Sequence, residues 1–200
     1  MRTVDLENIT LLKGAHTPDS QFCVMELAAY LGEEPWSDHP KCVSPVIAAF
    51  LRSWNDSLDD NTRQELKPYA LKSLNTVGTY AQEEQRAWMA IDWLVRECAP
   101  AFLRVAGLTE HAETLESLVA LTGEREVIEA QPSIVAARDA AGAAAGDAAW
   151  DAAGAAAWDA AGAAARAAAG KTLQPTVKSL QASAFLLLNR MIDVTSSRET

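Results

Sequence analysis

The chain has 200 residues, of which 49% are hydrophobic and 22% charged, and this ordinary globular composition argues against wholesale disorder. Its formal net charge of −10, without any cluster of Lys and Arg, argues against direct binding to nucleic acid. No run approaches 18 uninterrupted apolar residues, so we expect no membrane span.

The three cysteines also bear on the cellular setting. Their number is odd and they form no CxxC pair, which is typical of a reduced protein rather than a disulfide scaffold. The first residues lack the apolar core of a secretion signal. We therefore expect a cytoplasmic protein, and no sequence motif calls for a cofactor.

The first half of the chain reads as a series of short helices. After a turn-rich lead-in over residues 1–19, Ser20 is a candidate N-cap for a helix over 21–31, and Gly32 is its stop signal. A loop with two prolines then leads to Ser44 and Pro45, which are typical of a helix start and precede apolar residues at helical spacing up to Leu58.

The helical pattern continues to about residue 130. A helix from Asp59 is interrupted by Pro68, and residues 80–98 show the clearest amphipathic pattern in this part. Pro100 is expected to bend or restart that helix, and a further helix is predicted over 110–121. Short linkers between such helices indicate an all-α, bundle-like body over residues 1–130, which carries the whole excess of negative charge.

The next region is rich in alanine and built from tetrads. Residues 138–170 read RDAA GAAA GDAA WDAA GAAA WDAA GAAA RAAA G, and alanine is the best helix former. We expect one helix of roughly 36 residues within a region spanning 131–170, about 54 Å long. Gly170 and Pro175 are then predicted to separate it from a C-terminal apolar helix, Thr176–Asp193, in a last region spanning 171–200.

The alanine-rich region carries two large side chains, Trp150 and Trp158, on an otherwise small-residue surface. Small residues let another backbone approach closely, and an indole can anchor such a contact, so both are candidate partner-binding residues. Tandem duplication of GC-rich codons would produce the same repeat without any role for its surface. The sequence leaves both interpretations open.

Five residues form the candidate constellation for chemistry: Cys23, Glu26, Asp38, His39 and Cys42. Two thiolates and an imidazole could bind zinc through Cys23, His39 and Cys42, and Asp38 with His39 could orient an imidazole as a base for Cys23. The spacing matches no closed zinc module, and Cys23 falls within an apolar helical pattern. Structural burial is the competing interpretation, and it is favoured.

Two stretches, MRTVDLENITLLKGAH and CVMELAAYLGEEPWSDHPKCVSPVIAAFLRSWND, together with the tetrad region, resemble a family of uncharacterised proteins from actinobacteria and their phages. The resemblance covers residues 1–106 and the tetrad region. It implies a bacterial cytoplasm or an infected cell and a tail of variable length. It implies no catalytic residues.

The leading hypothesis from the sequence is a non-enzymatic helical protein that binds a protein partner or forms a homo-oligomer. A phage-encoded inhibitor, using its acidic body as a decoy for basic surfaces, is one version of it. The alternative is a metal-binding or cysteine-dependent enzyme that uses Cys23, His39 and Cys42.

Overall fold

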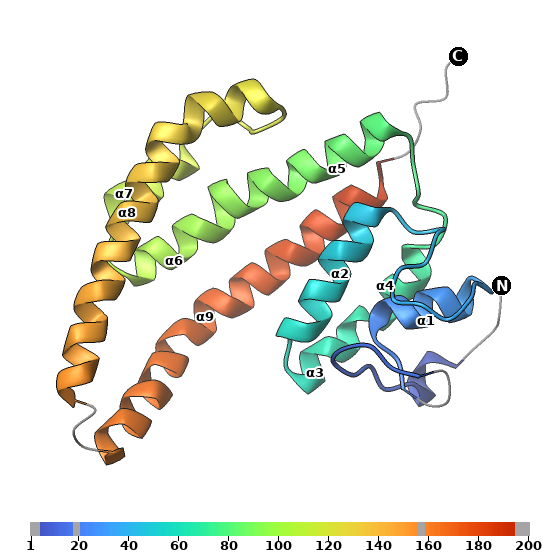
Figure 1. Ribbon diagram of the computed structural model, residues 1–200, viewed down its shortest axis with the longest axis horizontal. Coiled ribbons are helices and arrows are strands. Elements are labelled where there is room, and N and C mark those ends of the chain that lie inside the picture. Colours follow the sequence, from blue (N-terminus) through green and yellow to red (C-terminus); the bar gives the residue numbers. More distant parts are fainter. Residues whose placement is uncertain (1–4, 18–20, 156–158, 195–200) are drawn as a thin grey trace. The chain divides into compact units, whose positions relative to one another are not determined.

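The structure is a computed structural model that describes residues 5–17, 21–155 and 159–194, without the side chains of residues 146–170. All of the regular structure among these residues is helical, as expected from the sequence, apart from one isolated β-bridge between Leu11 and Phe22 (Figure 1). In chain order the elements are η1 (Leu6–Asn8), α1 (Val24–Leu31), α2 (Pro45–Ser57), α3 (Asp60–Arg63), η2 (Gln64–Leu66), α4 (Lys67–Lys72), α5 (Tyr80–Trp93), η3 (Leu94–Cys98), α6 (Ala99–Val105), α7 (Thr109–Glu116), α8 (Glu124–Ala155) and α9 (Asp159–Ile192).

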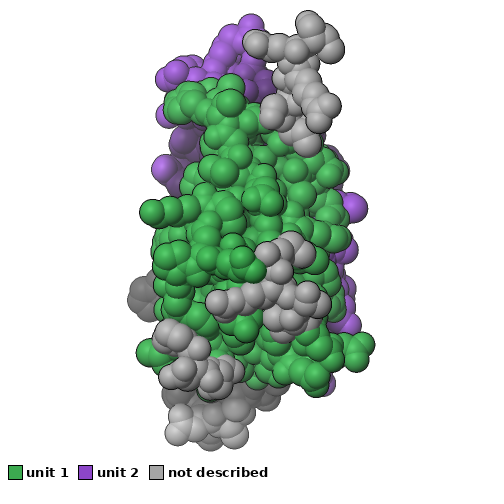
Figure 2. Space-filling model, turned by 90° about the vertical axis from the view of Figure 1, so that its right-hand side faces the viewer, with its two compact units in different colours: residues 1–87, 188–200 green, residues 88–187 purple. Residues whose placement is uncertain are grey.

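The chain divides into two compact units, which Figure 2 shows in different colours. Unit 1 contains residues 1–87 and 188–200, and unit 2 contains residues 88–187. The two borders fall inside α5 and inside α9. Each unit is therefore described by itself.

In unit 1 the buried helix α1 packs against α2 and α4. The sequence predicted that this first helix begins at residue 21, which is wrong, because α1 begins at Val24 with Cys23 as its N-cap. Phe22 is extended and accepts a hydrogen bond from the amide of Leu12 (2.9 Å). This pairing between two separate segments removes residues 21 and 22 from the helix.

The start of α2 follows the sequence closely. The Ser44 side chain accepts a hydrogen bond from the amide of Ile47, and Pro45 occupies the first turn, where its missing N–H costs nothing. At the other end of α2, the buried guanidinium of Arg63 donates to the carbonyls of Asn55 (2.7 Å) and Leu58 (2.5 Å). Arg63 thereby satisfies two carbonyls at the end of a helix, where intrahelical partners are missing.

A second buried arginine, Arg86, joins the last residues of unit 1 to α5. Its guanidinium donates to the carbonyl of Met191 (2.9 Å) and to that of Val194 (2.8 Å), and it forms an ion pair with Glu83 (2.7 Å). The residues that it holds are more than 100 positions away in the sequence. The end of α9 is thus anchored through polar contacts as well as through the buried side chain of Met191.

In unit 2, α5 widens into the π-helical turn η3, directly before α6. Pro100 has no N–H to donate to the carbonyl of Arg96, and a π turn shortly before a proline accommodates the missing bond. The sequence prediction that Pro100 bends or restarts the helix agrees with this geometry. After α6, Gly107 adopts a positive φ of 76°, which a residue without Cβ adopts without strain, and the chain turns into α7.

The last helix differs from the prediction at Pro175. Gly170 and Pro175 were expected to separate two helices, but Pro175 lies inside α9, and Pro132 likewise lies inside α8. Both prolines are exposed, and each is surrounded by many strong helix formers. The summed helix propensity of a long helix outweighs the roughly 3 kcal/mol cost of one proline.

The described residues do not test two other predictions about the alanine-rich region. The predicted single helix of roughly 36 residues would run through residues 156–158, which lie outside the described residues. The three-region division places its borders at residues 130 and 170, and these positions lie inside α8 and α9.

Candidate functional site

The first candidate site, around Cys23, is a buried structural cluster. The Glu26 carboxylate is 1% exposed and accepts hydrogen bonds from the amide of Cys23 (2.7 Å), the amide of His16 (2.5 Å) and Nδ1 of His16 (2.9 Å). In return, the amide of Glu26 donates to Sγ of Cys23 (3.4 Å). This reciprocal pair is a capping box at the start of α1, with a thiol in the place of the usual hydroxyl.

The environment of Cys23 opposes nucleophilic chemistry. Burial, together with the neighbouring Glu26 carboxylate, raises the pKa of the Cys23 thiol to about 12. A nucleophilic cysteine needs the opposite shift, because the thiolate is the reactive form. His16 rather than His39 is the imidazole bonded to this cluster.

We predict that Cys23 in the native protein is alkylated at pH 8 about a hundredfold or more slowly than in the urea-unfolded chain. The high pKa leaves little thiolate at this pH, and burial limits access to it. Mass spectrometry of iodoacetamide-treated protein over time measures the rate at each cysteine. The half-buried Cys98 is the internal control, and equal rates at Cys23 and Cys98 would contradict the prediction.

The other two candidates have partners of their own. Nδ1 of His39 lies 2.6 Å from Oδ1 of Asp38, and both side chains are solvent-accessible, at 65% and 30%. The amide of Cys42 donates to Glu34 (2.8 Å), and burial raises the pKa of the Cys42 thiol. The structure thus places Cys23, His39 and Cys42 in three different hydrogen-bonding environments. Within the described ranges, no group of three or more His, Cys, Asp or Glu side chains could hold a metal ion.

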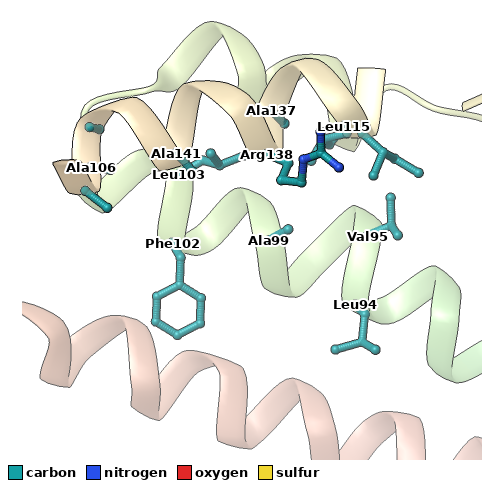
Figure 3. A pocket seen from close by; sticks show the side chains of 13 residues that line it. Leu94, Val95, Ala99, Phe102, Leu103, Ala106, Leu115, Ala137, Arg138 and Ala141 are labelled. Carbon is teal, nitrogen blue, oxygen red and sulfur yellow. The ribbon is translucent and has the colours of Figure 1, made fainter. Parts of the chain in front are cut away.

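A different feature stands out in unit 2, namely an apolar groove between the segment η3–α6 and α8 (Figure 3). Its volume is about 680 Å³. Arg138 is the one charged residue among the described side chains that line it. The others are six larger apolar residues and six alanines: Leu94, Val95, Phe102, Leu103, Leu115, Ile134, Ala99, Ala106, Ala137, Ala141, Ala144 and Ala145.

The groove combines a buried floor with exposed apolar walls. Leu103, Leu115 and Ala137 belong to the small core cluster of unit 2 and are buried. Leu94 and Phe102, in contrast, are 52% and 43% exposed, and Figure 3 shows both projecting from the same side of η3–α6. Apolar side chains of this size gain free energy when a partner covers them, so an exposed cluster of them is typical of a binding surface.

The sequence explains why α8 leaves room here. Ala137, Ala141 and Ala145 follow one another at four-residue spacing and therefore share one face of α8. Methyl side chains on that face cannot fill the space beside η3–α6, whereas Leu94 and Phe102 supply the larger surface on the other wall. The groove is thus lined by small residues of α8 and by larger residues of η3–α6.

The charges around the groove are unbalanced. Residues 94–145 contain four arginines, and each forms a salt bridge with a carboxylate: Arg96 with Asp92, Arg104 with Glu116, Arg125 with Glu126 and Arg138 with Asp139. The segment holds five more carboxylates, which form no salt bridge among the described residues: Glu97, Glu110, Glu113, Glu124 and Glu129. The helices that build the groove therefore carry an excess of negative charge.

Sequence analysis did not identify this groove. The apolar residues Phe102 and Leu103 and the alanines of α8 were visible, but nothing in their spacing says that they line one groove. The two tryptophans that were named as partner-binding residues fall elsewhere. Trp158 lies outside the described residues, and the side chain of Trp150 is also outside them.

Comparison with protein-family models, with curated proteins and with solved structures gives no match for this chain. None of the helices in the described part of the chain is both long enough and apolar enough to cross a membrane.

Proposed function

We propose that this chain is a non-enzymatic helical protein-interaction protein whose groove in unit 2 binds the apolar face of a helix from a partner protein. The observation that carries the proposal is the groove of about 680 Å³, with Leu94 and Phe102 exposed on one wall. Amphipathic helices commonly bind in this way, with apolar side chains at helical spacing inserted into a groove.

A helix fits the lining better than a small molecule does. Pockets for small molecules have a few well-placed polar groups that fix the ligand's orientation. Here the one polar side chain among the described lining residues is Arg138, which is exposed and already paired with Asp139 (2.8 Å). A helix face needs apolar contact and a close approach of backbones, and the alanines of α8 allow both.

We predict that Phe102→Glu weakens binding of an amphipathic helical peptide by roughly 30-fold, the loss typical of removing a central aromatic contact. The peptide has leucines along one face and uncharged polar residues along the other. Fluorescence anisotropy of the labelled peptide, titrated with the full chain, gives the Kd. Circular dichroism of the variant checks that the helical content is unchanged.

The matched control is Ile128→Glu. Ile128 also lies in unit 2 and is 59% exposed, but it is not among the described residues that line the groove. The control is expected to bind within twofold of the native chain. Absence of binding by the native chain, or equal losses in the two variants, would contradict the proposal.

The remaining parts of the proposed function come from the sequence. We propose that a bundle-like body, a long alanine-rich helix and an apolar C-terminal helix form the interaction protein, and that Trp150 and Trp158 add to its binding surface. The proposed setting is the cytoplasm of an actinobacterium or of a phage-infected cell, where the chain acts as an inhibitor of a protein partner. The alternative, an enzyme or metal protein using Cys23, His39 and Cys42, is favoured by no observation on the described residues.

A further inference from the structure

The end of α9 forms a strap on unit 1: we propose that residues 188–194 open and close as one segment, and that this movement is transmitted to the start of α2. The proposal concerns unit 1 alone and does not depend on the groove of unit 2. Leu188 and Met191 are fully buried, whereas Arg190 and Asp193 are exposed. The strap thus buries one side and leaves the other in solvent.

Arg86 supplies the polar part of the attachment. Its guanidinium donates to the carbonyls of Met191 (2.9 Å) and Val194 (2.8 Å), at the C-terminal end of α9, where carbonyls lack intrahelical donors. A positive charge at this end also complements the helix dipole. Arg86 is 1% exposed, so release of the strap leaves a buried guanidinium with Glu83 as its partner. The docked strap and the burial of Arg86 therefore depend on each other.

Glu83 connects Arg86 to the start of α2. Besides the ion pair with Arg86, its carboxylate accepts hydrogen bonds from the amide of Gly78 (2.9 Å) and from the hydroxyl of Ser44. The Ser44 hydroxyl in turn accepts from the amide of Ile47 in the first turn of α2 (3.3 Å). The hydrogen bonds run without a break from the strap to α2, and a contiguous polar network of this kind can carry coupling between distant segments.

A hollow of about 160 Å³ lies beside these bonds. Its lining includes Arg86, Asn75 and Gly78, together with Ile192 and Val194 of the strap. Water takes up about 30 Å³ per molecule in the liquid, so the hollow has room for water next to the guanidinium. Water there can accept the hydrogen bonds of Arg86 once the strap leaves. Opening of the strap therefore requires less free energy than unfolding of the buried helix α1.

Met191→Asp tests the coupling, because a carboxylate at this buried position opposes docking of the strap. Hydrogen exchange of the full chain, followed by NMR, measures the protection of single amides. We expect the protection of the Gly78 and Ile47 amides to fall at least about tenfold. The amides of Ala28 and Ala29, on α1, are expected to change by less than about threefold.

The matched control is Asn189→Asp. It adds the same charge to the strap, but at a half-buried position, and is expected to leave the protection of the Gly78 and Ile47 amides within about twofold. Met191→Ala is a milder variant that removes buried apolar contact without adding a charge. It is expected to lower the same two protections by about threefold, and it carries the test if Met191→Asp loses helical content in circular dichroism.

Glu83→Gln tests the path of the coupling. The amide cannot form the ion pair with Arg86 and offers a single acceptor oxygen. With Glu83→Gln present, Met191→Asp is expected to change the protection of the Ile47 amide by less than about twofold, because the connection between the strap and Ser44 is broken.

Three results would overturn the proposal. The first is unchanged protection at Gly78 and Ile47 in a folded Met191→Asp chain. The second is an equal loss of protection on α1, which would show that the strap opens only when the whole of unit 1 unfolds. The third is the same loss at Ile47 with and without Glu83→Gln, which would assign the coupling to apolar packing.

Discussion

Replacing Arg63 by alanine is expected to lower the free energy of unfolding by about 3 to 4 kcal/mol, the largest effect of a single substitution proposed for unit 1. The buried guanidinium donates to the carbonyls of Asn55 and Leu58 at the end of α2. Without it, two carbonyls lose their donor in an interior that admits little water, and the space of a large side chain is left empty. Urea unfolding followed by circular dichroism measures the change.

The control for this prediction is Arg52→Ala. Arg52 also donates to a carbonyl, that of Asp38 (3.0 Å), but it is only half-buried. Water can replace a half-buried donor, so we expect a loss under about 1 kcal/mol. Similar losses in the two variants would show that the burial of Arg63 does not determine its contribution.

The second large effect is expected for Glu26→Ala, at about 3 kcal/mol, because charged hydrogen bonds in a buried site are costly to remove. The substitution takes away the acceptor for the amides of Cys23 and His16 and for the ring of His16. It therefore weakens both the start of α1 and the attachment of the segment around His16. Trp36 should be affected as well, since its indole N–H donates to the carbonyl of His16 (2.7 Å).

Glu26→Gln separates shape from hydrogen bonding. The amide has the same size as the carboxylate but only one acceptor oxygen. We therefore expect the free energy of unfolding of Glu26→Gln to lie between those of the native chain and Glu26→Ala. Glu84 is exposed, so Glu84→Ala serves as the control for losing a glutamate side chain from the surface. The prediction fails if Glu26→Ala unfolds at the same urea concentration as Glu84→Ala.

Local signals in the sequence were sufficient for the elements whose ends depend on nearby residues. Ser44 and Pro45 mark the start of α2, and the π-helical turn before Pro100 follows from its missing N–H. The all-helical fold follows from the apolar periodicity and from the richness in alanine. These features involve residues within a few positions of one another.

The features that sequence reasoning missed depend on contacts between distant segments. The start of α1 moves to Val24 because Phe22 pairs with the chain near Leu11 and Leu12. Arg63, Arg86 and Glu26 are buried, yet nothing near them in the sequence distinguishes them from surface charges. Their burial follows from packing, and charged residues are seldom buried without partners.

The groove is a further case of this kind. The alanines of α8 and the large residues of η3 and α6 were each visible in the sequence. Their meeting in one groove depends on how α7 packs on α6 and on α8, which no local pattern encodes. The sequence therefore pointed to reactive side chains as the candidate site, whereas the structure offers an apolar surface.

The most direct test of the groove is site-specific photo-crosslinking. Benzoylphenylalanine at position 102 places a reactive group on the groove wall, and the same residue at position 128 serves as the control on α8. With the leucine-faced amphipathic peptide present, we expect a crosslink to the peptide from position 102 and little or none from position 128. Crosslinks from position 102 that join only the chain's own residues or a second copy, and never the peptide, would contradict the proposed binding in the groove.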